Sequence, residues 1–454
     1  MKQIRPYSLA FILLGLAFPA HAAYKVEFEG PSKKVIEIPA EKNTGLNYIY
    51  VSYDSAEINA ITISGITGTE IEVSRYSNLG GGYAEEIPSI LSQGHLKIEN
   101  PGGNLGYIVR DGMDSFCFWL VDYKTFPFDP QQIVMSDEQE CENTRLNILG
   151  SGEDIIFYTV DGRQMVLGRD VRLDYSTLEW NEEQELFEMV SIEKKLNSIS
   201  DPVILIPPFY CNTIVALSGD RFLKEWKQTK SIESQSFPPN AVTVNSKAEQ
   251  TNLPDSEEPS NILKDESDGL GGSAPADITF YGYVSDGVLH TEWQMASDED
   301  FEYILFRFNE QDVSYTFTEE GRYYMRFIGS NSDGSCETIG DTYSITIGSS
   351  DLRIPNAFSP NNDGVNDVWK VGYRSLLEFK CWIFDSKGNQ LFTFDDPAQG
   401  WDGKYRGKSV NPGVYYYVIQ ALGADGKKYK RSGDINILNY KKYGESTGGA
   451  VEEQ

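Results

Sequence analysis

The C-terminal quarter of the chain contains the stretch IPNAFSPNNDGVNDVW, residues 354–369, and its pattern decides how this part can fold. Around Gly364 stand five Asn and Asp residues within seven positions: Asn361, Asn362, Asp363, Asn366 and Asp367. Side chains of this type hydrogen-bond to their own backbone and tolerate positive φ. Pro355 and Pro360 hold extended backbone before and inside the stretch. The pattern therefore predicts a tight double turn that needs no metal.

The same cluster has a second interpretation, because hard cations such as calcium prefer clustered oxygen ligands. The candidate ligands are Asn361, Asp363 and Asp367. If Asp363 is position one of an EF-hand loop, position twelve is Arg374, where that loop needs a bidentate Glu. We therefore expect a structural turn with no cofactor and no metal, and we keep calcium as the alternative.

Four more motifs follow along the chain. They are FKCWIFDSKGNQLFTF (379–394), GWDGKYRGKSV (400–410), PGVYYYVIQA (412–421) and SGDINIL (432–438). We expect Trp401 in the core, with Asp402 and Gly403 forming the turn after it. Residues 414–419 are apolar on both faces, which is typical of a central strand in a small sandwich.

In this order the motifs resemble the gliding-motility-associated C-terminal domain, the type B sorting domain of the Bacteroidetes type IX secretion system, over residues 351–440. The positions that carry the resemblance are Pro355, Phe358, Pro360, Asn361, Asp363, Gly364, Asn366, Asp367, Trp401, Asp402, Gly403, Gly413 and Tyr415. One departure is FDSKG at 384–388, where the family usually has Asn-Arg-Trp-Gly. Gly388 keeps the turn but the apolar tip is missing, which puts any partner contact made by that tip in doubt.

The resemblance implies a route and partners. The route is Sec export, periplasmic transit and passage across the outer membrane through the type IX translocon. For type B cargo the family association is with a PorP/SprF-like outer-membrane barrel. The resemblance thus predicts a protein at the cell surface or outer membrane, or secreted.

The first 22 residues have the pattern of a secretory signal peptide. Lys2 and Arg5 provide the charged end, residues 9–18 form a short apolar run, and AHA at 20–22 fits small-residue cleavage. The apolar run is shorter than the roughly 20 residues that a membrane-spanning helix needs. We therefore expect an exported polypeptide, which agrees with the predicted route.

The net charge and the scarcity of His and paired Cys residues argue against several kinds of partner and site. The formal net charge is −29, and it becomes −31 once the two positive charges of residues 1–22 are removed. Such a chain repels phosphate backbones, so we expect no nucleic-acid partner. The three His residues and the absence of a Cys-x-x-Cys motif argue against a zinc site or a His-dependent nucleophile.

Short strand patterns bounded by turn residues recur along the chain, and sustained helical periodicity is scarce. We therefore predict an all-β protein: serial Ig-like β-sandwich modules, a flexible acidic segment and a small C-terminal β-sandwich. The expected divisions are a signal peptide (1–22), a β-sandwich module (23–128), an Ig-like module (129–205), a partial Ig-like module (206–249), a flexible acidic linker or loop (250–276), a PKD/Ig-like module (277–350), the sorting domain (351–440) and a tail (441–454).

The module at 277–350 resembles PKD/Ig-like repeats of bacterial surface proteins. Trp293 lies in VLHTEWQMA (288–296), and a Tyr-rich strand pattern ends in SNSDGSC (330–336). The Trp-Asp-Phe-Gly-Asp-Gly core of a typical PKD repeat is missing, so Ig-like is the safer description. The preceding acidic segment is too poor in apolar residues to fold alone, and it is either a linker between domains or a loop within one.

The five cysteines can form at most two pairs within the chain, so at least one thiol stays free. They are Cys117, Cys141, Cys211, Cys336 and Cys381. Because separate modules would place Cys211 and Cys336 far apart, we expect no disulfide between them.

Three functions remain. The first is a binding or adhesion or structural protein of the cell surface, with a glycan or protein as possible ligand. The second is an accessory component of the gliding or secretion apparatus at the outer membrane. The third is a secreted carbohydrate-active enzyme, which would use paired carboxylates. Acids such as Glu179, Glu182, Glu183 and Glu185 are abundant but show no distinctive spacing, so we expect no enzyme.

Overall fold

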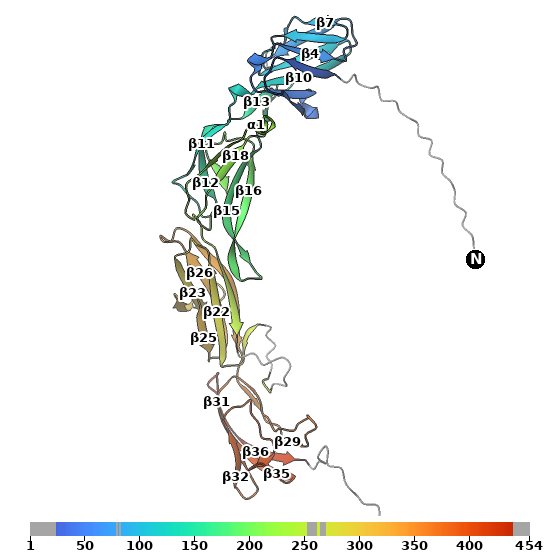
Figure 1. Cartoon of the computed structure of the whole chain (residues 1–454). Helices are drawn as coiled ribbons and strands as arrows, with labels where there is room; N and C mark the ends of the chain where they lie inside the picture. Colours follow the sequence, from blue (N-terminus) through green and yellow to red (C-terminus); the bar gives the residue numbers. More distant parts are fainter. Residues whose placement is uncertain (1–23, 79, 81–82, 252–260, 264–268, 439–454) are drawn as a thin grey trace, which may run out of the picture. The chain divides into compact units, whose positions relative to one another are not determined.

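The computed structural model describes residues 24–78, 80, 83–251, 261–263 and 269–438, and in them the fold is almost entirely β (Figure 1). One short α-helix, α1 (Arg221–Glu225), and three single-turn 3-10 helices accompany the strands. The all-β prediction of serial sandwiches is confirmed. The expected signal peptide and tail fall outside the described residues. Within the described residues, no helix is both long enough and apolar enough to cross a membrane.

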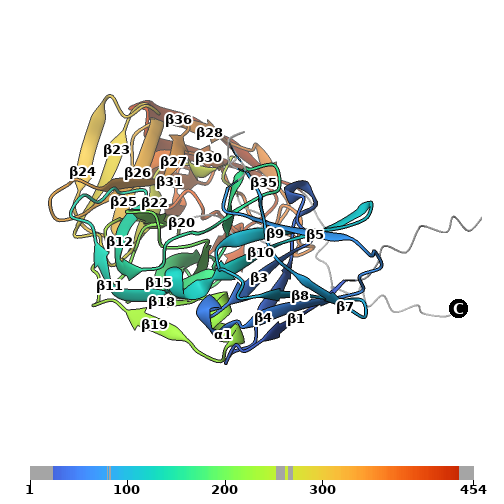
Figure 2. The same cartoon turned by 90° about the horizontal axis from the view of Figure 1, so that it is seen from above.

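The chain divides into two compact units, and the first begins with a two-sheet sandwich. One sheet has the strand order β1 (Lys25–Glu29), β4 (Ala60–Ser64), β8 (His95–Glu99), β7 (Ile90–Ser92). The other has the order β2 (Ile36–Pro39), β3 (Tyr48–Ser52), β10 (Asp114–Asp122), β9 (Leu105–Asp111), β5 (Ile71–Tyr76), β6 (Glu85–Glu86). Both sheets can be followed in Figure 2. Residues of both, such as Ile61 and Phe118, form one buried core.

The second sandwich, most of which belongs to this unit, is larger than the sequence predicted. One sheet has the order β11 (Asp129–Met135), β12 (Thr144–Ser151), β17 (Ile204–Ile206). A two-stranded sheet contains β13 (Ile155–Tyr158) and β14 (Gln164–Leu167). A third sheet has the order β16 (Leu186–Leu196), β15 (Val171–Asn181), β18 (Ala216–Gly219), β19 (Lys230–Glu233). Leu173 of β15 and Leu217 of β18 are cross-strand partners, and both are fully buried. Residues 216–233 therefore complete this sandwich, and the predicted partial module at 206–249 does not exist as a separate fold.

A buried ion pair joins the two sandwiches of the first unit. Arg169, with no exposed surface, donates from Nη1 to Asp220 Oδ2 at 2.7 Å and from Nη2 to the carbonyl of Phe126 at 2.7 Å. The Tyr123 hydroxyl donates to the same Asp220 oxygen at 3.0 Å. Because Tyr123 and Phe126 follow the last strand of the first sandwich, the pair fixes the connection between the two sandwiches.

The second unit contains the Ig-like sandwich predicted near Trp293. One sheet has the order β20 (Val244–Gln250), β22 (Ala276–Val284), β25 (Val313–Phe317). The other has the order β21 (Leu270–Gly272), β27 (Glu337–Ile347), β26 (Gly321–Ser330), β23 (His290–Ala296), β24 (Ile304–Phe308). Trp293 is fully buried between them and packs against Phe280 and Phe327.

Strand β20 corrects the predicted boundary of this sandwich. It pairs with β22 in antiparallel register from Val244–Val284 to Gln250–Ile278. The two strands flank the acidic segment, so of the two alternatives for 250–276 the structure favours a connection within one domain. The flexibility expected for most of that segment concerns residues 252–260 and 264–268, which lie outside the described residues.

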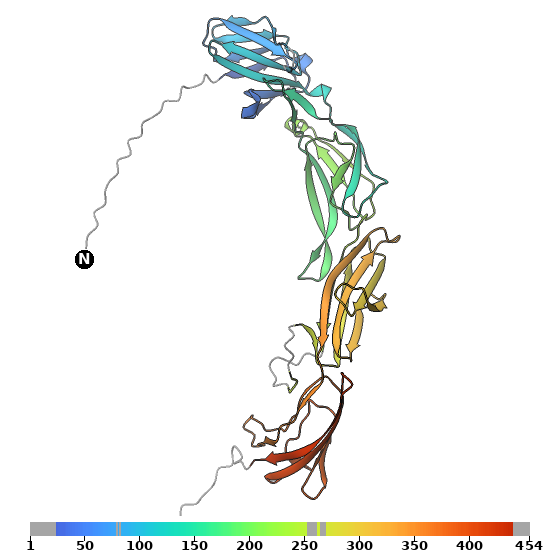
Figure 3. The same ribbon diagram turned by 180° about the vertical axis from the view of Figure 1, so that it is seen from behind.

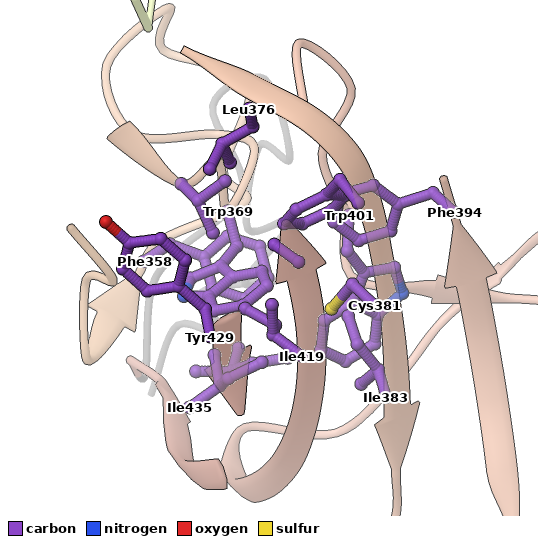
Figure 4. Close-up of a cluster of buried hydrophobic side chains, with 14 residues drawn as sticks. Phe358, Trp369, Leu376, Cys381, Ile383, Phe394, Trp401, Ile419, Tyr429 and Ile435 are labelled. Carbon is purple, nitrogen blue, oxygen red and sulfur yellow. The ribbon is translucent and has the colours of Figure 1, made fainter. Parts of the chain in front are cut away.

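The C-terminal module follows directly, and Figures 1 and 3 show it from two sides. Its main sheet has the order β29 (Ala357–Phe358), β36 (Lys428–Ile437), β35 (Gly413–Gly423), β31 (Leu376–Phe384), β32 (Gln390–Phe394). Two small sheets accompany it: β28 (Asp351–Arg353) with β30 (Gly372–Arg374), and β33 (Lys404–Tyr405) with β34 (Lys408–Ser409). Its core gathers the side chains of Trp369, Trp401, Cys381 and Ile383 (Figure 4).

Three cysteines are free and buried: Cys117, Cys211 and Cys381. The prediction that at least one thiol stays free is confirmed. Since Cys211 is a free thiol, the prediction of no Cys211–Cys336 disulfide is also confirmed.

Candidate functional site

The Asn/Asp cluster forms a turn whose side chains bind its own backbone. Both carboxylate oxygens of Asp367 accept backbone N–H groups, Oδ1 from Asn362 at 2.6 Å and Oδ2 from Gly364 at 2.8 Å. Asp363 accepts the N–H of Val365 at 2.8 Å. Gly364 has φ of +87° and Asn362 has φ of +63°, as a double turn of this kind requires. The Asp side chains of the cluster therefore bond the backbone of their own turn, as expected of this residue type.

A calcium site would compete with these hydrogen bonds. Asn361 donates from Nδ2 to Asp363 Oδ2 at 2.7 Å and accepts the Asp363 N–H at 3.1 Å. The Asn361 side chain and then the Val365 N–H hold the pKa of Asp363 below its ordinary value. Among the described residues, no group of three His, Cys, Asp or Glu is arranged for a metal. Calcium at Asn361, Asp363 and Asp367 stays a hypothesis for experiment.

The two motif tryptophans join the motif at 354–369 to the motif at 400–410. Trp369 and Trp401 exchange backbone hydrogen bonds, N–H to carbonyl, at 2.9 and 3.0 Å. Both indoles are fully buried, and both satisfy their ring N–H groups. Trp369 Nε1 donates to the Pro355 carbonyl at 2.7 Å, and Trp401 Nε1 donates to the Lys404 carbonyl at 2.9 Å. Each tryptophan thus fixes the backbone of its own motif while filling the core.

The turn after Trp401 lies directly against the first motif. Gly403 has φ of +72°, and a Cβ there would lie 3.0 Å from Pro360 Cγ and 3.4 Å from Phe358 Cζ. The Phe358 ring lies 5.7 Å from the Trp401 ring. Asp402 accepts the Lys404 N–H at 3.1 Å and closes the turn. Glycine at 403 is favoured twice, by its left-handed backbone angle and by this close contact.

The motif at 412–421 completes the group. Tyr415 lies 5.3 Å from the Trp401 ring, and its hydroxyl donates to the Asn411 carbonyl at 2.8 Å. Gly413 begins β35 opposite Ile437. The structure therefore brings Phe358, Pro360, Trp401, Gly403 and Tyr415 together, as expected for one module. Asn361, Asp363, Gly364 and Asp367 lie in the adjoining exposed turn, where Asn366 accepts the Ser359 N–H at 3.0 Å through its carbonyl.

The turn at 384–388, which departs from the family pattern, is held by one aspartate. Asp385 accepts the N–H groups of Lys387 and Asn389 at 2.8 and 2.9 Å. Gly388 has φ of +84° and keeps the turn, as predicted. Its tip consists of polar residues, so this hairpin end offers hydrogen-bonding groups where the family usually offers Trp.

Sequence reasoning missed a contact from the acidic segment. Asn261 donates from Nδ2 to the carbonyls of Val371 and Pro397, each at 2.7 Å. Tyr373 and this segment exchange backbone hydrogen bonds, with its N–H donating to Asn261 and its carbonyl accepting from Leu263. Residues 261–263 therefore lie along β30. No local pattern in an acidic, proline-containing stretch marks such a contact.

The main sheet also has an outer face that sequence reasoning did not single out. Side chains of neighbouring strand positions point to opposite faces, and the core residues Cys381, Ile383 and Ile419 mark the inner one. The alternate positions form cross-strand pairs, Trp382 with Val418 and Phe384 with Tyr416. Apolar residues of the outer face outside the core cluster are Trp382, Phe384, Val414, Tyr416 and Val418.

Lysines lie at one end of this outer face. Gln420 of β35 is the cross-strand partner of Lys380 on one side and of Lys430 on the other. The Lys380 ammonium lies 5.9 Å from the Trp382 ring centre. Residues 351–438 carry twelve Lys and Arg against ten Asp and Glu, whereas the whole chain has a net charge of −29. The module is therefore slightly basic within a strongly acidic protein.

Comparison with known proteins supports the division of the chain into a sandwich near residues 129–233 and a C-terminal module. Residues 133–234 match the family model described as fibronectin type III domain, which agrees with the single sandwich found there. Among curated proteins, none matches the chain. A crystal structure of chicken CNTN1 FN1-FN3 domains is 11% identical, with 68% of this chain and 99% of that chain covered and a TM-score of 0.22.

A crystal structure of dimeric latent PorU from Porphyromonas gingivalis is also 11% identical, with a TM-score of 0.15. It covers 66% of this chain, which spans only 31% of that one. Residues 352–437 match the family model described as CHU_C type IX secretion signal domain. The chain therefore carries a type IX secretion signal domain, built around Trp369 and Trp401, as its motifs predicted.

Proposed function

We propose that this protein is cargo of the type IX secretion system. Residues 1–22 direct it through Sec into the periplasm, and the C-terminal module then directs it across the outer membrane. The sandwiches between residues 24 and 350 act at the cell surface or outside the cell as a binding, adhesion or structural protein, without catalysis. The observation that carries the proposal is the match to a type IX signal domain over residues 352–437.

The partner in this step is a PorP/SprF-like outer-membrane barrel, and we assign its docking site to the outer face of the main sheet. Val414 and Tyr416 are each 46% exposed there, on a strand whose alternate residues fill the core. Apolar side chains supply area to bury, Lys380 and Lys430 supply positive charge at one end of the face, and Asp434 lies opposite Tyr416. An acidic partner surface meets least repulsion at this module, because the rest of the chain is strongly acidic.

The test replaces outer-face side chains without touching the core. The double variant Val414→Ser, Tyr416→Ser should accumulate in the periplasm, because its docking surface loses apolar area. Val365→Ser is the matched control, since Val365 is 61% exposed in the same module but belongs to the Asn/Asp turn. The readout is surface protease accessibility in intact cells, with the thermal unfolding of each purified variant measured in parallel.

Deletion of residues 351–454 tests the route itself, and it should also leave the protein in the periplasm. If the truncated chain reaches the surface as efficiently as the full chain, the type IX route is wrong. If only the outer-face variant is exported normally, the route stands and the docking surface lies elsewhere.

The role of the sandwiches is tested by capture from outer membranes. The purified mature chain should retain glycans or surface proteins if it is an adhesion or binding protein. Enrichment of translocon or motor components by residues 24–350 would instead assign the protein to the gliding or secretion apparatus.

A further inference from the structure

The connection between the Ig-like sandwich and the signal domain is only three residues long, Gly348–Ser350, between β27 and β28. Both backbone polar groups of its first residue, Gly348, are hydrogen-bonded. The Gly348 N–H donates to the Gly272 carbonyl at 2.9 Å, and the Gly348 carbonyl accepts from Ser375 Oγ at 2.6 Å. The chain therefore leaves the sandwich already fixed to a residue of the signal domain.

The next two residues are held by the signal domain itself. The Ser349 carbonyl accepts from Arg374 Nε at 2.8 Å. Ser350, only 6% exposed, donates its N–H to Asp425 Oδ2 at 3.3 Å and its hydroxyl to Asp425 Oδ1 at 2.7 Å. Its carbonyl accepts from the Tyr429 hydroxyl at 2.9 Å. All three residues of the connection thus have a bonded carbonyl, and two have a bonded N–H.

A second set of contacts crosses the same boundary beside the connection. Ser375 is fully buried; its N–H donates to Ser273 Oγ at 2.8 Å, and its hydroxyl oxygen accepts the Ala274 N–H at 3.1 Å. Ala424, in the turn between β35 and β36, packs against the core cluster of the Ig-like sandwich. The boundary is therefore an interface between two folded modules and contains no free linker.

A protease needs an exposed backbone stretch whose hydrogen bonds are open, which is why nicking concentrates in exposed loops and fraying segments. In the connection at 348–350, every carbonyl and two of the three N–H groups are hydrogen-bonded, Ser350 is buried, and Gly348 and Ser349 are half-buried. The connection is therefore neither an open loop nor a fraying segment. We propose that the signal domain is not removed at this boundary after export, and that it remains a structural part of the mature surface protein together with the Ig-like sandwich.

This proposal rests on the proposed export function, and the first experiment separates the two. The full-length protein is expressed in a Bacteroidetes host with a working type IX system, and the surface and medium fractions are analysed by intact mass. The expected species extends from the signal-peptide cleavage site to Gln454. A surface species ending between about 344 and 353 would overturn retention while leaving export intact. Absence from both fractions would overturn the export function instead.

The second experiment tests why the boundary resists cleavage. Asp425→Ala removes the acceptor for both Ser350 donors, and Asp385→Ala is the matched control. Each aspartate accepts backbone N–H groups in a hairpin turn of the signal domain, but only Asp425 binds the connection. The purified mature chain is treated with a broad-specificity protease, and cut sites are mapped over time. Because hydrogen bonds to charged groups contribute about 1.5–3 kcal/mol, Asp425→Ala should speed cleavage at 348–352 by about tenfold or more.

Equal cleavage rates at 348–352 in the two aspartate variants would show that these hydrogen bonds do not protect the boundary, and that outcome overturns the physical argument. Insertion of a ten-residue Gly/Ser segment between Ser349 and Ser350 is the positive control for access. This variant should be cut first within the insert. Ser350→Ala removes the hydroxyl that bonds Asp425 and Tyr429 but keeps the N–H bond to Asp425, so it should give a smaller increase than Asp425→Ala. This variant covers the case in which Asp425→Ala loosens its own turn.

Discussion

The two faces of the main sheet in the signal domain use the same strands for different purposes. Along β31, Cys381 and Ile383 belong to the buried core, whereas Trp382 between them lies outside it. Along β35, Ile419 is fully buried and Tyr416 is 46% exposed. A strand of aromatic and β-branched residues therefore does not identify its buried face by composition. The pairing register and the position of the motif tryptophans decide which residues hold the fold.

The contributions of the two faces to stability should differ most clearly when each face loses a tryptophan. Trp401→Ala empties a fully buried site between Phe358 and Tyr415 and should destabilise the module by about 3–5 kcal/mol. Trp382→Ala changes the outer face and should cost about 0.5 kcal/mol. Hydrogen exchange of the β35 and β36 amides in the full chain measures both. Similar loss of protection in the two variants would contradict the assignment of the faces.

Thiol chemistry probes the same alternation along one strand. Burial raises the pKa of the Cys381 thiol to about 12, so this thiol stays protonated at pH 8 as well as lacking access. Lys380→Cys places a thiol at the neighbouring exposed position. In the native chain the introduced cysteine should alkylate while Cys381 does not, and both should react in denaturant. Native labelling of Cys381 would mean that the inner face opens.

The Asn/Asp turn borders the core without being part of it, so its effect should be smaller. Gly364→Val forces a β-branched residue to φ of +87°, which should cost about 1–3 kcal/mol. No atom lies within 4 Å of a Cβ built at Gly364, so the cost arises from backbone strain and not from a clash. Thermal unfolding of the full chain checks this value, with Val365→Ser as the control at the next residue. An unchanged unfolding temperature would show that the turn adapts.

The sequence revealed the parts of the site whose interactions are local. Asp363 and Asp367 bind N–H groups two to five residues away, and Trp401 donates to a carbonyl three residues away, so a short motif contains the whole arrangement. Ser350 and Asp425 are 75 residues apart, and Asn261 and Val371 are 110 apart. Ordinary Ser, Asp and Asn side chains carry no pattern that predicts such partners.

The predicted divisions at 206–249 and 250–276 differ from the structure for a related reason. The acidic segment at 250–276 has few apolar residues, and such a composition indicates a stretch that contributes little to a hydrophobic core. The chain nevertheless returns to the same sheet, because β22 pairs with β20 on the far side of the stretch. Similarly, Leu217 completes a core begun by Leu173, although a cysteine and several prolines intervene. Strand pairing across long connections depends on the partner surface, which no single segment displays.

Chelation gives the smallest expected effect and the clearest decision on calcium. If the turn is held by its own hydrogen bonds, EDTA should leave the unfolding temperature of the full chain unchanged, because Asp363 and Asp367 already have N–H donors. Asp367→Ala should lower that temperature equally with and without EDTA, since it removes the acceptor of two backbone N–H groups. A calcium site would behave differently: EDTA would destabilise the unmodified chain, added calcium would restore it, and Asp367→Ala would abolish the response. That result would reassign Asn361, Asp363 and Asp367 from turn formation to metal binding.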